Sequence, residues 1–196
     1  MPIALIFKMA QTKLIQQQHS SLFRVVVFGP ESTGKTTLCK DLAAHYKTLW
    51  VPEFARDYLQ EKWDTTQEIC TLEDLPTIAQ GQMNLENEAL KNASKVLFCD
   101  TNILVTQIWS ETHFDGYCDP KIIAAVNQVH YDLYLLTGVD IPWEADDLRD
   151  RPNDREGMFE YFKVKLEEQN VAYEYIKGDR ENRIKQATTA IDSIIL

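Results

Sequence analysis

The 196-residue sequence contains only 7 glycines and 7 prolines, and it has no internal repeat or low-complexity segment. This scarcity excludes a chain that is disordered over most of its length. No apolar run approaches the roughly 20 residues that a membrane-spanning helix needs. The apolar stretch at residues 2–7 lacks the basic start and the closely following small-residue site of a secretory signal. We therefore expect a cytoplasmic protein without a membrane partner.

Metal-binding and disulfide patterns are also missing. The four cysteines show no C-x-x-C spacing, and the four histidines do not cluster near them. A zinc site would need such spacing, and a disulfide framework would be expected only in a small secreted chain. The cysteines are therefore expected to be reduced, partly buried thiols.

Positive charge is scarce relative to negative charge. There are 20 Lys and Arg residues against 30 Asp and Glu residues, which gives a formal net charge of −10. Such a chain repels a polyphosphate backbone, so nucleic acid is not expected as a partner. Any phosphate site must be built locally.

Segments with the apolar pattern of a strand alternate along the chain with segments that have the apolar spacing of a helix. We expect residues 1–22 to be an N-terminal extension and residues 23–196 to form one domain. Strands are expected at 23–28, 49–51, 95–99, 133–136 and 173–176, and helices from 35 and at 55–62, 75–93, 103–111, 121–129, 155–169 and 180–195. Continuous apolar strands that alternate with helices predict an α/β fold, with a parallel sheet covered by helices on both faces.

The clearest motif is G-x-x-x-x-G-K-[ST], placed between a predicted strand and a predicted helix. It is formed by Gly29, Pro30, Glu31, Ser32, Thr33, Gly34, Lys35 and Thr36, with Thr37 following. Backbone N–H groups of such a loop cradle nucleotide phosphates, the lysine reaches the β- and γ-phosphates, and the hydroxyl binds Mg²⁺. We therefore predict an ATP and Mg²⁺ site here; the alternative is a glycine turn with a solvated lysine.

A second acid follows a second buried strand. Asp100 comes directly after an apolar run, at the strand end where ligands bind in open α/β sheets. It is a candidate magnesium ligand or general base; the alternative is a simple N-cap of the following helix, a role that is compatible with the first.

The nucleotide loop alone does not distinguish a kinase from a switch or a motor. The chain has neither an N-K-x-D nor an L-S-G-G-Q motif. It has a late run of arginines, Arg149, Arg151 and Arg155, which predicts a lid that neutralises a transferring phosphoryl group. The alternative is a solvated, salt-bridged loop. Trp143 beside this segment is a candidate substrate contact.

Two further segments are expected near the cleft. Glu53 and Arg56 follow the second predicted strand and are candidates for binding the acceptor, with Glu53 as a second possible base; the alternative is a helical ion pair between them. Gly178 joins the last strand to the last helix, where this fold places the nucleotide base; the alternative is that it is only a turn residue.

Several motifs together resemble the ribosylnicotinamide kinase domain of the NadR-like family. They are GPESTGKTTLCKDLA, EFARDYL, FCDTNILVTQ and WEADDLR, and the similarity extends from about Phe23 to the C-terminus. Two positions depart from the family pattern: Pro52 stands where those kinases have Trp, and Asn102, a candidate substrate contact, replaces the last Asp of D-T-D.

The resemblance implies a P-loop kinase fold with strand order 2-3-1-4-5. It also implies that ATP with Mg²⁺ phosphorylates the 5′-hydroxyl of a ribonucleoside, with nicotinamide riboside as the first candidate and NAD biosynthesis as the setting. The alternative is a nucleotide-dependent binding switch or a weak ATPase. The oligomeric state stays open.

Overall fold

The computed structural model describes residues 15–195, which form five strands and seven helices. The strands are β1 (Phe23–Phe28), β2 (Trp50–Val51), β3 (Val96–Asp100), β4 (Leu133–Thr137) and β5 (Tyr173–Ile176). The helices are α1 (Lys35–Tyr46), α2 (Phe54–Thr66), α3 (Leu75–Ala89), α4 (Ile103–His113), α5 (Pro120–Val126), α6 (Arg155–Gln169) and α7 (Arg180–Ile195).

All the strands run parallel, in the order β2-β3-β1-β4-β5, which confirms the expected order. The register pairs Val27 with Asp100 and, on the other side, with Leu135. Because parallel strands all end at one edge, the loop after β1 and the acid at the end of β3 lie next to each other.

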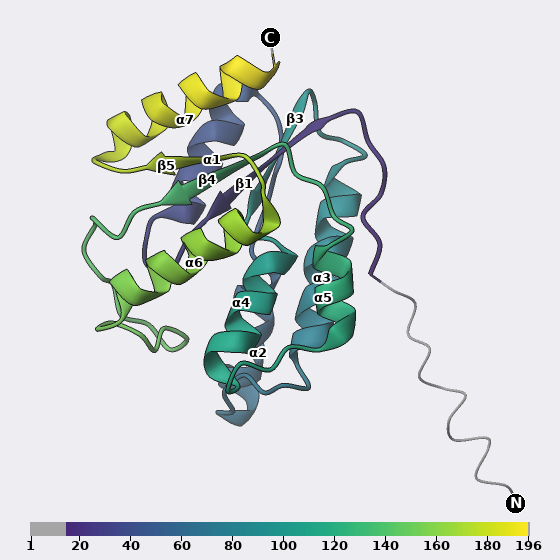
Figure 1. The fold of residues 1–196 in the computed structure, drawn as a ribbon, viewed down its shortest axis with the longest axis vertical. Coiled ribbons are helices and arrows are strands. Elements are labelled where there is room, and N and C mark those ends of the chain that lie inside the picture. The colour runs from purple at the N-terminus through teal and green to yellow at the C-terminus, as the bar shows by residue number, and fades with distance from the viewer. Residues whose placement is uncertain (1–14, 196) are drawn as a thin grey trace, which may run out of the picture.

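Helices cover both faces of the sheet, as the continuous apolar strands predict (Figure 1). Val25 and Val27 pack with α1 and α7 on one face, whereas Val26 and Phe28 pack with α3, α4, α5 and α6 on the other. Successive side chains of a strand point to opposite faces, so a strand between two helical layers is apolar at every position.

Several element boundaries differ from the expected ones. Helix α2 continues to Thr66, four residues past the expected end, whereas α3 stops at Ala89 because residues 90–92 form a turn. Helix α5 starts at Pro120, after Asp119 accepts a hydrogen bond from the Lys121 N–H. Pro at the first position and Asp as N-cap are a common helix start.

The expected N-terminal extension falls partly outside the described residues, since residues 1–14 are not among them. Residues 15–22 lie against the domain. Ile15 packs on the core, the Gln17 amide exchanges two hydrogen bonds with the His130 backbone, and the Gln18 N–H donates to Asn87 at 2.8 Å. The boundary at residue 23 stays a prediction.

Two other expectations concern the described part of the chain. None of the four cysteines is paired there: Cys39, Cys99 and Cys118 are buried, and Cys70 is half-buried. Within residues 15–195, no helix has both the length and the apolar character needed to cross a bilayer.

Candidate active site

The nucleotide loop, residues 29–36, links β1 to α1 at the carboxyl edge of the sheet. Gly34 has a φ of 78° and stands at the N-cap of α1, a left-handed conformation that favours glycine. The Lys35 ammonium bends back to donate to the Pro30 carbonyl at 2.7 Å. Among the described residues, the N–H groups of residues 31–34 donate to no protein acceptor. They are therefore free to bind an anion at the start of α1.

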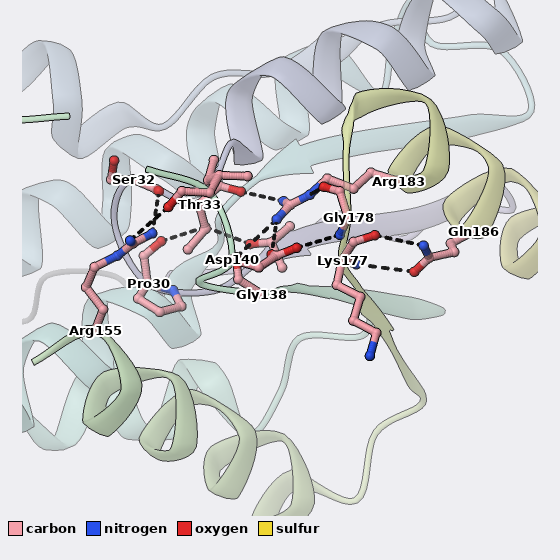
Figure 2. A network of polar contacts seen from close by, with 12 residues as sticks. Pro30, Ser32, Thr33, Gly138, Asp140, Arg155, Lys177, Gly178, Arg183 and Gln186 are labelled. Atoms are coloured by element: carbon pink, nitrogen blue, oxygen red, sulfur yellow. Dashed lines mark hydrogen bonds and ion pairs between the residues drawn. The ribbon is translucent and has the colours of Figure 1, made fainter. Parts of the chain in front are cut away.

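Two arginines from distant parts of the chain hold the loop backbone (Figure 2). Arg155, at the start of α6, donates to the Ser32 carbonyl at 2.9 Å, and Arg183, in α7, donates to the Thr33 carbonyl at 2.7 Å. The Thr33 hydroxyl also donates to the Pro30 carbonyl at 2.8 Å. These bonds occupy the loop carbonyl groups and fix the shape of the loop.

Asp100 meets Thr36 at the base of the cleft. The Thr36 hydroxyl donates to Asp100 Oδ2 at 2.5 Å. Asp100 Oδ1 is buried and has no hydrogen-bond partner among the described residues. Burial raises the pKa of this carboxyl, and the Lys35 charge partly offsets that effect. Asp100 does not cap α4, because Asn102 occupies the N-cap position.

A hydroxyl beside an unsatisfied carboxylate oxygen suits Mg²⁺ chemically. Mg²⁺ in nucleotide sites commonly takes one or two protein oxygens, with phosphates and water completing the octahedron. Among the described residues there is no group of three or more His, Cys, Asp or Glu that could hold a metal by itself. Thr36 and Asp100 thus fit a metal that a bound nucleotide would share.

A cavity of about 580 Å³ extends from the nucleotide loop past Asp100 to the first turn of α2. Its walls include every predicted loop residue, Gly29 to Thr37, together with Glu53, Arg56, Asn102 and the three lid arginines. The sequence-based candidates from the loop, β3, α2 and the lid are therefore brought together at one cleft.

Glu53 is a half-buried carboxylate in this cavity. Burial raises its pKa to about 7, against the lowering effect of Lys35, and the Asp100 charge raises it further. Among the described residues, its carboxylate makes no hydrogen bond or ion pair. A carboxylate with a pKa near neutrality and no partner is suited to accept a proton.

Arg56 does not pair with Glu53, so the expected alternative of a helical ion pair is wrong. Its guanidinium donates two hydrogen bonds to Asp146, at 2.6 and 3.2 Å. That hydrogen-bonded pair raises the pKa of Arg56. The contact joins α2 to the lid segment, residues 138–155.

The lid arginines line the cavity, and each is held by protein acceptors. Arg151 reaches the Thr112 carbonyl at 2.6 Å and His113 Nε2 at 3.2 Å, both at the end of α4. Arg149 pairs with Asp146 at 3.0 Å, and Arg155 contacts the nucleotide loop as described above. The segment is therefore attached to α2, α4 and the loop, unlike a freely solvated loop.

Two predicted contacts do not line the cavity. The Trp143 ring instead lies against the Arg155 guanidinium, 5.8 Å from ring centre to carbon. Gly178 lies in the turn between β5 and α7, where its carbonyl accepts from Arg183 at 2.8 Å and its N–H donates to Asp140 at 2.5 Å. Both residues thus contact side chains that hold the site rather than the cleft itself.

Sequence reasoning missed Arg183 and Gln82. Arg183 is only 5% exposed and bonds to the Thr33, Gly138 and Gly178 carbonyls and to Asp140. Gln82, from α3, lines the cavity and is 3% exposed. No local motif marks either residue, since their partners are distant in sequence.

Comparison with known proteins gives matches over most of the chain. A family model described as "AAA domain" matches residues 24–183. The trifunctional NAD biosynthesis/regulator protein NadR of Salmonella typhimurium is 30% identical over 174 residues, covering 87% of this chain and 42% of that protein. The protein of the same name from Escherichia coli is 31% identical over 160 residues, covering 81% and 38%. The chain spans less than half the length of these relatives.

Solved structures share the fold. A NadR protein in complex with NR has a TM-score of 0.70 at 20% identity, over 88% of this chain and 51% of that one. A deoxyadenosine kinase from M. mycoides has a TM-score of 0.66 at 11% identity, over 88% of this chain and all of that one. The fold is therefore that of the P-loop nucleoside kinases, as expected.

Proposed function

The chain belongs to the AAA domain family, and from this premise we propose that it is a kinase that transfers the ATP γ-phosphate to a small nucleoside. One observation carries the proposal: an unpartnered carboxylate, Glu53, shares a cavity with the nucleotide loop and with Asp100. A switch or a simple ATPase does not need a proton acceptor for a second substrate, whereas a kinase of a hydroxyl group does.

The residues divide between the two substrates. The loop N–H groups and Lys35 bind the phosphates, and Thr36 with Asp100 would hold Mg²⁺. When bound, Mg²⁺ neutralises part of the phosphate charge. Glu53 and Arg56, at the start of α2, face the acceptor side. Positive charge from Lys35 and the lid arginines stabilises the charge that develops on the transferring group.

Glu53 is the better candidate for the general base. Asp100 is engaged by Thr36 and suited to the metal, whereas the pKa of Glu53 is raised to about 7, near a working pH. In the reaction, the acceptor oxygen bonds to the γ-phosphorus while the bond to the bridging oxygen breaks. The bridging oxygen keeps the electron pair in ADP, and the hydroxyl proton passes to Glu53.

The acceptor we propose is a ribonucleoside, phosphorylated at its 5′-hydroxyl, with nicotinamide riboside as the first candidate. The support is the similarity to NadR proteins, for which structures are solved in complex with NR and in complex with NAD and AMP-PNP. The match covers less than half of the curated NadR proteins, so only the kinase activity is proposed here.

A substrate screen tests this proposal. Purified protein, ATP and Mg²⁺ are incubated with nicotinamide riboside and the common ribo- and deoxyribonucleosides, and the products are identified by mass spectrometry. We expect a monophosphate from at least one acceptor and much faster ATP consumption in its presence. ATP hydrolysis with no phosphorylated acceptor would contradict the kinase assignment and favour a switch or ATPase.

A further inference from the structure

Helix α2 begins without a hydrogen bond to the side chain of its own N-cap residue. Its N-cap is Glu53, and the Glu53 side chain accepts no hydrogen bond from the first turn. The first N–H groups of a helix have no partner inside the helix, and an N-cap side chain commonly supplies one. Because Glu53 does not, another group must satisfy the start of α2.

Gln82 supplies the missing acceptor from the neighbouring helix α3. The N–H of Phe54, the first residue of α2, donates to Gln82 Oε1 at 2.9 Å. An N–H can only donate, so this bond fixes the amide with its oxygen toward α2. The amide nitrogen is turned toward Glu86 Oε1, at 3.5 Å.

The buried acid Glu86 holds this orientation. Glu86 is fully buried on α3, and its second oxygen accepts a hydrogen bond from the Tyr131 hydroxyl at 2.8 Å. The Gln82 amide nitrogen can only donate, so Glu86 Oε1 accepts from it. The Phe54 N–H also can only donate, and these two donors together fix the orientation of the Gln82 amide.

Close packing fixes the same point of α2. Gly81 lies beside Phe54, and a Cβ at that position would come within 2.3 Å of the Phe54 ring. The glycine thus allows the ring to pack against the α3 backbone. Two adjacent residues of α3 therefore fix the start of α2: Gly81 leaves room for the Phe54 ring, and Gln82 accepts a hydrogen bond from the Phe54 N–H.

We infer that Gln82 is a positioning residue that caps the first N–H of α2 and so fixes the start of the helix, with the Glu53 carboxylate directed toward the acceptor. If this cap were lost, the start of α2 would no longer be held against α3 at this point, and the Glu53 carboxylate would lose its fixed place in the cavity. The cap rests on geometry alone, whereas its catalytic consequence rests on the proposed function.

Hydrogen exchange of the Phe54 amide, followed by NMR, tests the cap without any activity measurement. We expect Gln82→Met to speed exchange of this amide by about five- to tenfold, the equivalent of a lost helix cap. The matched control is Gln80→Met, which removes a half-buried glutamine of the same helix whose amide donates to Asn84 within the described part of the chain. The control should leave Phe54 exchange unchanged; equal exchange in Gln82→Met and the wild type would refute the cap.

A second variant protects this test against misfolding. Gln82→Glu combined with Glu86→Gln keeps an acceptor opposite the Phe54 N–H, a donor from residue 86 and an acceptor for Tyr131. We expect exchange of the Phe54 amide within about twofold of the wild type, since every one of these bonds can form again. Exchange as fast as that expected for an uncapped helix would refute the proposal even if Gln82→Met does not fold.

A double-mutant cycle with Glu53 tests the catalytic consequence. We expect Gln82→Met to lower kcat/KM for the acceptor about fivefold or more while the KM for ATP stays within twofold. In a Glu53→Gln background, Gln82→Met should have no further effect, because it acts through that carboxylate. If the two substitutions lower kcat/KM additively, Gln82 does not act through the Glu53 carboxylate, and the catalytic consequence is overturned. A wild-type protein that phosphorylates no acceptor would contradict the proposed function alone, and the exchange measurement would still decide the cap.

Discussion

Replacing Arg183 by alanine is expected to destabilise both the fold and the nucleotide loop. The guanidinium is buried and donates to three backbone carbonyls, those of Thr33, Gly138 and Gly178. It also pairs with Asp140, at 2.5 Å. These partners belong to the nucleotide loop, the start of the lid and the turn before α7, so a single side chain joins three segments (Figure 2).

The magnitude follows from the groups that alanine would leave behind. Two of the bonds, to the Thr33 and Gly138 carbonyls, are buried, and each unsatisfied buried acceptor costs about 1–3 kcal/mol. Asp140 also loses its ion pair, although it is partly exposed and water can replace some of that interaction. We expect a loss of about 3–5 kcal/mol in the free energy of unfolding, chiefly from the two buried acceptors that are left without a donor.

The assay is urea unfolding together with the KM for ATP. Arg183→Ala should lower the unfolding midpoint and raise the KM for ATP, because the Thr33 carbonyl is no longer held away from the phosphates. Arg183→Lys keeps the charge but not the planar fork of donors, so it should be intermediate. The matched control is Arg180→Ala, one turn earlier in α7, which removes an exposed pair with Asp41 and should change neither quantity appreciably.

The reasoning would be refuted by a small effect. If Arg183→Ala unfolds within about 1 kcal/mol of the wild type, its hydrogen bonds do not hold the three segments together. If stability falls but the KM for ATP does not move, Arg183 supports the fold without shaping the loop.

The remaining predictions concern residues that line the cavity. Lys35→Ala should abolish phosphoryl transfer and leave the circular dichroism spectrum intact; retained transfer would mean that the loop does not bind the nucleotide. The kcat/KM for the acceptor should rise as the pH increases through about 7, because Glu53, whose pKa burial raises to about 7, accepts a proton only when deprotonated. Glu53→Gln should remove this rise, and a pH profile unchanged by the substitution would exclude Glu53 as the base. In the unfolded chain Glu53 loses its proton near pH 4.5, whereas in the folded protein it keeps the proton up to about pH 7, because burial raises its pKa. The free energy of unfolding therefore decreases as the pH rises from 4.5 to 7. Glu53→Gln should therefore unfold at higher urea than the wild type at pH 8, and the gain should shrink as the pH falls toward 4.5. Arg151→Ala should lower kcat more than it lowers ATP affinity, since the lid arginine acts on the transferring group. Equal effects on both in steady-state kinetics would indicate ground-state binding.

The sheet and the nucleotide loop could be predicted because their signals are local. The apolar run at β1, the glycine-bearing loop and the start of α1 are consecutive, and each has its own period or motif. Helix ends were less predictable. The apolar period of α3 continues past Ala89, but the chain turns there before β3.

Contacts between distant residues could not be predicted from one sequence. The spacing of Glu53 and Arg56 allows a helical ion pair, yet Arg56 bonds to Asp146, which is 90 residues away. Gln82 has no pattern that marks it as a cap for a different helix. Such contacts depend on how the helices pack, and packing overrides the preference of a short spacing.

The two arginines that hold the nucleotide loop have a consequence for the order of synthesis. The loop is encoded near the start of the domain, whereas its carbonyl groups are held by residues 123 and 150 positions later. A growing chain therefore exposes the loop long before Arg155 and Arg183 leave the ribosome. Chains are made from the N-terminus at about 5–20 residues per second, so Arg183 is added about 8 to 30 seconds after the loop. We expect nascent chains that end before α7 to bind ATP poorly, and nucleotide to stabilise the protein only after α7 has docked.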